Sequence, residues 1–256
     1  MKTKHKNIRE LFGGKKPRSI YSIPFSADLR VLVLGPHPDD FDAIGVTLNF
    51  FKGNGNPIEV GVVRTASGVE DSYCSHTTHG EKIRIREKEQ RRSCRFFGLP
   101  DACLTFLDLG QGYGANPQAA VEKRDLLAEF ILSRQPDLVF LPHGNDKNIS
   151  HQKMYALFKQ IVLQAGYPIV SFLNRDPKTI AMRVDLYAEF DKEQAEWKGE
   201  LLRFHDSQQQ RNLNTRGHGF DDRILNVNRR SARELSLAAE YAETFELEFH
   251  DMLMTG

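Results

Sequence analysis

The sequence predicts an α/β fold whose sheet is mainly parallel. Short apolar runs typical of buried strands alternate with segments whose apolar residues recur at helical spacing. Strands that alternate with helices form βαβ units, which place their strands side by side in a parallel sheet. The chain has 256 residues, 40% of them hydrophobic and 27% charged, so it is long enough to bury a sizeable core. We therefore expect a Rossmann-like three-layer domain with a smaller C-terminal α+β portion.

The predicted elements follow one another regularly in the first two thirds of the chain. Strands are predicted where runs rich in β-branched and aliphatic residues end near glycine, proline or polar residues. These runs lie at residues 28–36, 57–65, 102–109 and 136–144. A helix is predicted after each strand, where apolar residues recur at helical spacing and stop at glycine or before proline. These helical segments lie at residues 44–53, 79–97, 117–135 and 150–165.

The pattern weakens towards the C-terminus, and the N-terminus has a different composition. A strand is predicted at residues 179–190 and a helix at residues 191–208; a polar stretch follows at residues 209–223. The first 28 residues are basic, and we expect a solvated arm that lies over the domain or a partner subunit; contact with a polyanion is the alternative. We divide the chain into this arm (1–28), a main domain (29–178) and a C-terminal portion of the same fold (179–256).

Composition excludes several classes of protein. The net charge of +1 gives no general attraction to nucleic acid or to an anionic membrane. Three cysteines without a C-x-x-C pair argue against a disulfide framework and suit a reducing cytosol. There is no apolar run long enough to span a membrane and no apolar block of a signal peptide. We expect a cytoplasmic protein without nucleic-acid partner or membrane insertion, and leave a homo-oligomer open.

Polar side chains gather where two of the predicted strands end. They are His37, Asp39 and Asp40 after the first strand, and His143, Asp146 and His151 after the fourth. In an open α/β sheet, ligands bind in the crevice beyond the carboxyl ends of the strands. Histidines and carboxylates that meet there suit a divalent metal, because a catalytic zinc has three protein ligands and an open position for water. The alternative is that Asp39 and Asp40 only cap the next helix, and the second cluster favours the metal.

The motifs together resemble those of a known family. The stretch "PHPDD" follows the first strand, and "DKNISH" stands where the family usually has D-x-H-P-D-H. Further matches run in the family's order from about residue 29 to residue 248: "TASGVE", "REKEQRRSCRFFG", "LDLGQG", "WKGELLRFHDSQ" and "AAEYAETF". In this the chain is similar to the LmbE / PIG-L family of zinc-dependent N-acetylglycosamine deacetylases. The resemblance implies a hydrolase that removes an acetyl or similar acyl group from a small-molecule amino sugar or a glycoconjugate.

The resemblance also implies roles for individual residues. His37, Asp40 and His151 correspond to the ligands of zinc, or of another divalent metal. Asp39 corresponds to the general base that takes a proton from the attacking water. On this interpretation residues 29–178 are the metal-binding catalytic domain, and residues 179–256 complete the substrate pocket.

Departures from the family's motifs bear on the catalytic and substrate-binding residues. The usual histidine of D-x-H-P-D-H is Asn148 here, a neutral donor that is weaker than a charged one. We predict Asn148 as the catalytic residue at the oxyanion, and His143 as a substitute for the lost imidazole. Predicted substrate contacts are Arg86, Asp42, which stands one place after the family's usual Glu, and Gln111, which replaces an Asp.

Other histidines and another class of function remain as alternatives. His76, His79 and His205 are further candidates for the lost imidazole, but we expect each of them at the surface. Arg86 has a structural alternative as a solvated helix arginine. The altered "DKNISH" motif keeps open a catalytically weakened, metal-binding relative that serves as a binding or assembly protein.

Overall fold

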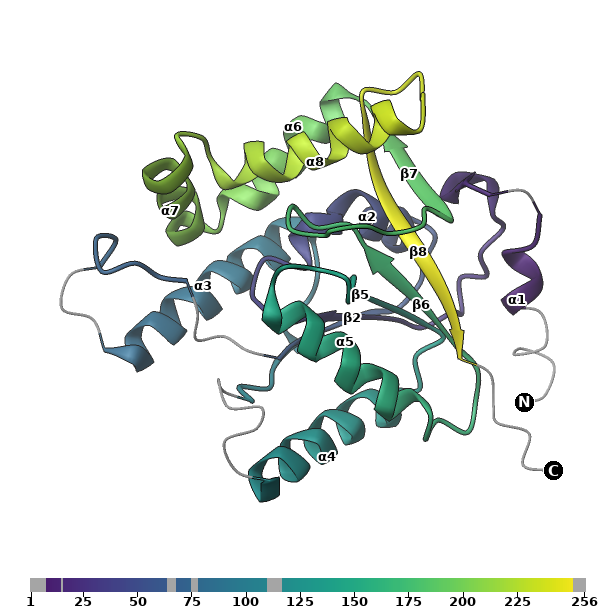
Figure 1. The fold of residues 1–256 in the computed structure, drawn as a ribbon, viewed down its shortest axis with the longest axis horizontal. Coiled ribbons are helices and arrows are strands. Elements are labelled where there is room, and N and C mark those ends of the chain that lie inside the picture. Colours follow the sequence, from purple (N-terminus) through teal and green to yellow (C-terminus); the bar gives the residue numbers. More distant parts are fainter. Residues whose placement is uncertain (1–7, 15, 64–67, 75–77, 110–116, 251–256) are drawn as a thin grey trace.

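A single sheet runs through the computed structural model, which describes residues 8–14, 16–63, 68–74, 78–109 and 117–250 (Figure 1). Its strands are β1 (Arg18–Ser19), β2 (Val31–Gly35), β3 (Ile58–Val62), β4 (Leu104–Phe106), β5 (Leu138–Pro142), β6 (Ile169–Asn174), β7 (Leu186–Phe190) and β8 (Tyr241–His250). Their order across the sheet is β1-β7-β8-β6-β5-β2-β3-β4. All neighbours pair in parallel except β8, which is antiparallel to both β6 and β7. The predicted α/β fold with a mainly parallel sheet is confirmed.

Helices cover both faces of this sheet. They are α1 (Ile8–Leu11), α2 (Gly45–Gly53), α3 (His79–Phe97), α4 (Pro117–Arg134), α5 (Ile149–Val162), α6 (Lys192–Arg203), α7 (Asp206–Arg216) and α8 (Phe220–Glu234). Within the part of the chain that the structure describes, no helix is both long and apolar enough to cross a bilayer.

The three layers follow from the alternation of side chains along the strands. In β2, Val31 and Val33 belong to a core with residues of α2 and α3, whereas Leu32 and Leu34 belong to a second core with residues of α4 and α5. Successive side chains of a strand point to opposite faces, so both faces of β2 are buried. Figure 1 shows α4 and α5 together on one side of the sheet and α6 and α8 on the other.

The order of the strands places the site. β2 lies at the centre and pairs in parallel with β3 on one side and β5 on the other. The chain therefore proceeds from β2 in one direction and later returns to add β5 in the other, which makes a topological switch point between β2 and β5. The carboxyl ends of these two strands lie together, and a crevice opens where the segments that follow them diverge.

Several elements beyond residue 166 differ from the prediction. β6, a fully buried apolar strand, was not predicted, and β8 was assigned to no element. The polar stretch at residues 209–223, to which no element was assigned, belongs mostly to α7 and α8. In α7 the buried side chains are Ser207, Gln208 and Asn212, which are polar. The helix packs through hydrogen bonds, so apolar periodicity could not reveal it.

From Ile8 onward, the described part of the N-terminal segment lies over the domain and is not a solvated arm. Ile8, Phe12, Ile20, Ile23 and Phe25 are all buried in the main core, and β1 extends the sheet beside β7. Burying a large apolar side chain contributes about 1.5–3 kcal/mol. Five such side chains outweigh the tendency of a basic segment to remain in water.

Candidate metal and catalytic site

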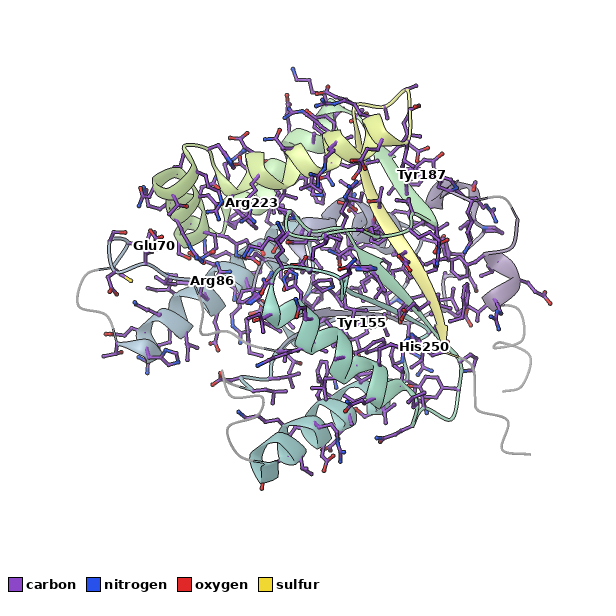
Figure 2. The ribbon with its side chains drawn as sticks, in the orientation of Figure 1. Glu70, Arg86, Tyr155, Tyr187, Arg223 and His250 are labelled. Atoms are coloured by element: carbon purple, nitrogen blue, oxygen red, sulfur yellow. The ribbon has the colours of Figure 1, made fainter. Side chains whose placement is uncertain are left out.

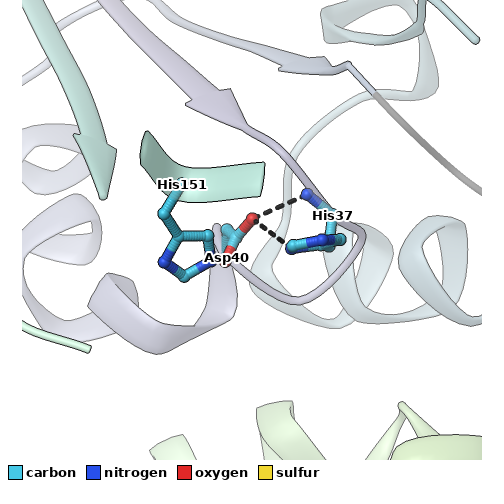
Figure 3. Close-up of side chains that lie close together, drawn as sticks. All are labelled: His37, Asp40 and His151. Carbon is cyan, nitrogen blue, oxygen red and sulfur yellow. Dashed lines mark hydrogen bonds and ion pairs between the residues drawn. The ribbon is translucent and has the colours of Figure 1, made fainter. Parts of the chain in front are cut away.

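Two histidines and one carboxylate converge at the switch point. His37 and Asp40 lie in the turn after β2, and His151 lies in the first turn of α5 (Figure 3). One ligand atom from each of the three lies within 4.8 Å of the others. Asp40 Oδ1 is 3.6 Å from His151 Nε2, and Asp40 Oδ2 is 3.5 Å from His37 Nδ1. Two imidazole nitrogens and a carboxylate oxygen at this spacing form a three-ligand set that fits a divalent metal. We call His37, Asp40 and His151 the metal set.

The turn after β2 is compact and depends on Gly35. The backbone N–H of His37 donates to Asp40 Oδ2 at 2.7 Å, which orients the carboxylate. A Cβ atom at Gly35 would lie 2.9 Å from the carbonyl oxygen of His37 and 3.2 Å from Cβ of Asp40. Any larger residue at the end of β2 would therefore displace the turn that carries both side chains.

A second carboxylate stands behind His151. Asp146 Oδ2 is 3.5 Å from His151 Nδ1, and the hydroxyl of Thr179 donates to the same oxygen at 3.2 Å. Burial alone would lower the pKa of His151, but Asp146 and Asp40 on its two sides raise that pKa to about 9. The imidazole therefore lies where carboxylates on two sides favour positive charge. A carboxylate behind a ligating histidine is the usual support of such ligands.

Asp39 faces away from its neighbour Asp40. Its φ of 111° lies in the region that side chains rarely adopt, so the surrounding contacts must hold it. Arg86 Nη2 donates to Asp39 Oδ2 at 2.7 Å, and the N–H of Asp39 donates to Gln90 Oε1 at 2.9 Å. Adjacent carboxylates therefore meet different partners, an arginine for Asp39 and two histidines for Asp40.

The two carboxylates also differ in their proton affinity. Burial raises the pKa of Asp39 above its usual range, although the guanidinium of Arg86 opposes the shift. Burial acts in the same direction on Asp40, but hydrogen bonds from His37 and the nearby His151 outweigh it and lower its pKa. Environments that separate the pKa values of two neighbouring carboxyl groups are typical of sites where the two groups have different roles, one of them the exchange of protons.

Two predicted substrate contacts are buried instead. Arg86 is 1% exposed, and besides Asp39 its guanidinium donates to Glu89 Oε2 at 2.7 Å and to the carbonyl of Pro38. Arg86 lines the pocket, but both of its Nη atoms donate to protein groups, so it orients Asp39. Asp42 is 0% exposed and does not line the pocket; it accepts a hydrogen bond from Gln90 at 3.0 Å.

His205 is the partner of Asp42, which corrects its expected surface position. His205 Nε2 lies 2.6 Å from Asp42 Oδ2, and both side chains are 0% exposed. The ring also lies 3.4 Å from Arg86 Nη1, so His205 connects Asp42 with the arginine that holds Asp39. The sequence did not reveal the pair because His205 and Asp42 are 163 residues apart in the chain.

Asn148 and His143 occupy different places. Asn148 is the N-cap of α5: its Oδ1 accepts a hydrogen bond from the N–H of Ser150 at 3.1 Å, and the side chain lines the same pocket as the metal set. His143 does not line that pocket; its Nδ1 accepts from the N–H of Asn145, and its Nε2 is 3.3 Å from Glu246. The expectation that His143 supplies the lost imidazole therefore has no geometric support. Gln111 and His76 lie outside the described residues, and His79 is exposed as predicted.

The pocket includes residues that the sequence interpretation missed. Asp176 lines it and lies with Asp146 and His151 in a second group whose ligand atoms approach within 4.8 Å. Asp176 follows β6, so recognising that strand would have placed it at the same edge of the sheet. The pocket is closed on another side by residues of α7 and α8, among them Gln208, Asn212, Arg216, Phe220 and Arg223.

Comparisons with known proteins agree with this architecture. The model of the family described as PIG-L, GlcNAc-PI de-N-acetylase, matches residues 32–162, more than half of the chain. The chain belongs to the PIG-L family. The match begins in β2 and ends at the end of α5, so it contains His37, Asp40 and His151 but none of α6, α7 and α8. No curated protein matches the sequence.

Solved structures share the fold at low sequence identity. N,N'-diacetylchitobiose deacetylase from Pyrococcus horikoshii is 19% identical, with a TM-score of 0.68 over 86% of this chain and 83% of that one. A zinc-inhibited form of teicoplanin deacetylase is 15% identical, with a TM-score of 0.63 over 86% and 98%. The 4-carboxy-2-hydroxymuconate hydratase of Pseudomonas putida KT2440 is 16% identical, with a TM-score of 0.63 over 89% and 100%. The PIG-L fold thus carries both deacetylases and a hydratase.

The close approach at Gly35 gives a test of the metal set. Gly35→Ala should weaken divalent-cation binding by about 5- to 150-fold, because overpacking of about 1–3 kcal/mol falls on the turn that orients His37 and Asp40. Competition with a chromophoric chelator measures this affinity. Gly80→Ala, in α3 with nothing within 4 Å of the added Cβ, is the matched control and should bind as the unaltered protein does. Equal affinity in both variants would contradict the assignment.

Proposed function

We propose that this chain is a metal-dependent N-deacetylase that hydrolyses the acetamide of an amino sugar or a glycoconjugate. The observation that carries the proposal is the division between two adjacent carboxylates. Asp40 faces His37 and His151 in the arrangement of a ligand, whereas Asp39 is fixed on Arg86 and lines the same pocket. A metal hydrolase needs these two functions side by side, one group that binds the ion and one that accepts a proton.

The donor set favours zinc among the divalent metals. Two imidazoles and one carboxylate are a frequent set for catalytic zinc, and a fourth position is then open to water or substrate. A bound divalent ion lowers the pKa of its water to about 7 and polarises a carbonyl oxygen. His37, Asp40 and His151 would hold it, with Asp146 supporting His151 from behind.

Asp39 moves the proton in this proposal. It accepts a proton from the attacking water as the oxygen of that water bonds to the carbonyl carbon, and it returns the proton to the amide nitrogen as the C–N bond breaks. One water is consumed; the hydroxyl proton of the new carboxyl group also passes to the amine, so acetate and a protonated amine are released. Arg86 keeps the carboxylate in place through both transfers, since its guanidinium remains charged throughout.

Asn148 supplies the donor for the oxyanion. Its Oδ1 is engaged in capping α5, so the Nδ2 hydrogens are the part of the side chain available to a bound carbonyl. The position at the N-terminus of α5 adds the partial positive charge of the helix end. The neutral amide of Asn148 and the helix end together provide part of the oxyanion stabilisation that a charged imidazole would give.

Membership of the PIG-L family and the deacetylases among its structural neighbours support this chemistry over the alternatives. The hydratase neighbour uses the same fold, so the fold alone does not select hydrolysis. The direct test is release of acetate from a panel of N-acetyl sugars by the zinc-loaded protein. Release that requires the metal supports the proposal; a loaded protein that hydrolyses no acetamide favours the binding-protein alternative.

The role of Asp39 predicts a variant that separates metal binding from turnover. Asp39→Asn should retain the metal and lower kcat by about two to four orders of magnitude, because a positioned base is removed while asparagine tolerates a positive φ. Metal content by elemental analysis and acetate release are measured on the same sample. His37→Ala is the contrasting variant and should lose the metal and the activity together. Loss of metal from Asp39→Asn would make Asp39 a ligand and contradict the assignment.

Asn148 predicts a separate loss. Asn148→Ala should lower kcat by about 10²–10³-fold, the usual effect of removing one oxyanion donor, with metal content unchanged. His143→Ala, at the residue that follows β5, is the matched control and should retain turnover, because its ring lies outside the pocket. A large loss of activity in His143→Ala with a nearly silent Asn148→Ala would reverse the assignment.

A further inference from the structure

The pocket that contains the metal set is also lined by cations that the proposed chemistry does not use. They are Lys178, Arg211, Arg216 and Arg223. With Arg86 they make five cationic side chains against the three carboxylates of Asp39, Asp40 and Asp176 in the same lining. A bound divalent ion would add two further positive charges. The whole chain is nearly neutral, with 35 lysines and arginines and 34 acidic residues. A general excess of positive charge therefore does not explain why cations gather in this pocket.

Most of these cations lack an acidic partner. Among the described residues, the guanidinium of Arg223 and the ammonium of Lys178 make no hydrogen bond or ion pair, and Arg216 donates only to the hydroxyl of Thr215. Arg211 is 3.7 Å from Glu70, a loose pair. Arg95, an exposed arginine on α3, is by contrast bound to both oxygens of Asp101.

The position of Arg223 is electrostatically unfavourable for its guanidinium. It is only partly exposed on α8, and burial together with the nearby Arg216 and Arg211 lowers its pKa even though Asp176 lies near. A partly desolvated guanidinium beside like charges is unfavourable without an anion. Figure 2 labels Arg223 on α8 and Arg86 on α3, two helices whose side chains meet at this pocket.

The elements that carry the cations are fixed by specific contacts. Gln208 of α7 donates to the carbonyl of Gly68 at 2.9 Å, and the N–H of Ser207 donates to Glu89 Oε1 at 2.7 Å, which anchors α7 on α3. Gln209 of α7 donates to Asp221 at 2.6 Å and joins α7 to the start of α8. The arginines of α7 and α8 are therefore presented by an ordered scaffold, outside the residues that match the family model.

We infer that the pocket binds an acylated amine that also carries an anionic oxygen group, a phosphate or a carboxylate, held by Arg223, Arg216 and Lys178. Guanidinium groups match both anions with paired hydrogen bonds, and a neutral sugar would leave these cations uncompensated. That the substrate carries an acyl group rests on the proposed function. That it carries an anionic group is inferred from the cations alone.

Steady-state kinetics on a matched set of sugars tests this inference. The substrates are N-acetylglucosamine, its 1-phosphate and 6-phosphate, and N-acetylmuramic acid, whose carboxylate distinguishes the two anions. At least one charged sugar should exceed the neutral one in kcat/KM by about 10- to 100-fold, mainly through KM, and the advantage should shrink with added salt. Equal kcat/KM for all four would overturn the inference and leave the deacetylase proposal standing.

Variants locate the anion site. Arg223→Ala should reduce the ratio of charged to neutral kcat/KM by about tenfold or more, and the exposed Arg216→Ala provides a second variant that does not disturb the core. Arg233→Ala, an exposed arginine of α8 outside the pocket, is the matched control and should keep the ratio. An unchanged ratio in both Arg223→Ala and Arg216→Ala would overturn the inference.

Calorimetric titration separates this inference from the proposed function. If the protein hydrolyses none of the sugars, the 1-phosphate and 6-phosphate are titrated into the unaltered protein and into Arg223→Ala at equal metal content. Binding that weakens in the variant supports the anion site although the deacetylase proposal fails. Equal binding to both proteins, or none to either, refutes the anion site.

Discussion

A buried arginine keeps two neighbouring carboxylates apart, and the rest of the site depends on this separation. Arg86 reaches from α3 to Asp39 in the turn after β2, where the backbone has a positive φ. Asp40, the next residue, is thereby left to face His37 and His151. If Asp39 could turn towards the histidines, both carboxylates would compete for one cation, and neither would be free to accept a proton.

The arginine is itself held by a buried network that extends across the chain. Glu89 pairs with Arg86 on its own helix and accepts from Ser207 at the start of α7, while His205 joins Arg86 to Asp42. Removing one member of a buried charge pair typically costs about 3–5 kcal/mol, because the remaining charge is left without compensation. The network thus couples the geometry of the site to the docking of the C-terminal helices, which also present the cations of the pocket.

The sequence predicts correctly that His37, Asp40 and His151 lie close together, but it predicts their surroundings poorly. His37, Asp40 and His151 follow strands whose apolar runs are unmistakable, and parallel topology brings such strand ends together. Asp176 was missed because β6 was not recognised, and the cations of α7 and α8 were missed because α7 packs through polar side chains. Burial of Asp42 and Arg86 depends on partners far away in the chain or on another element, which no local pattern reveals.

The separation of Asp39 from Asp40 is tested most directly by locating the ion. Crystals of the zinc-loaded protein, measured at the zinc absorption edge, give the ion's position and its ligands in one anomalous difference map. We expect a single peak bound by His37, Asp40 and His151, with the Asp39 carboxylate on Arg86 and outside the coordination sphere. A peak bound by Asp39, or one placed instead among Asp146, His151 and Asp176, would contradict the account.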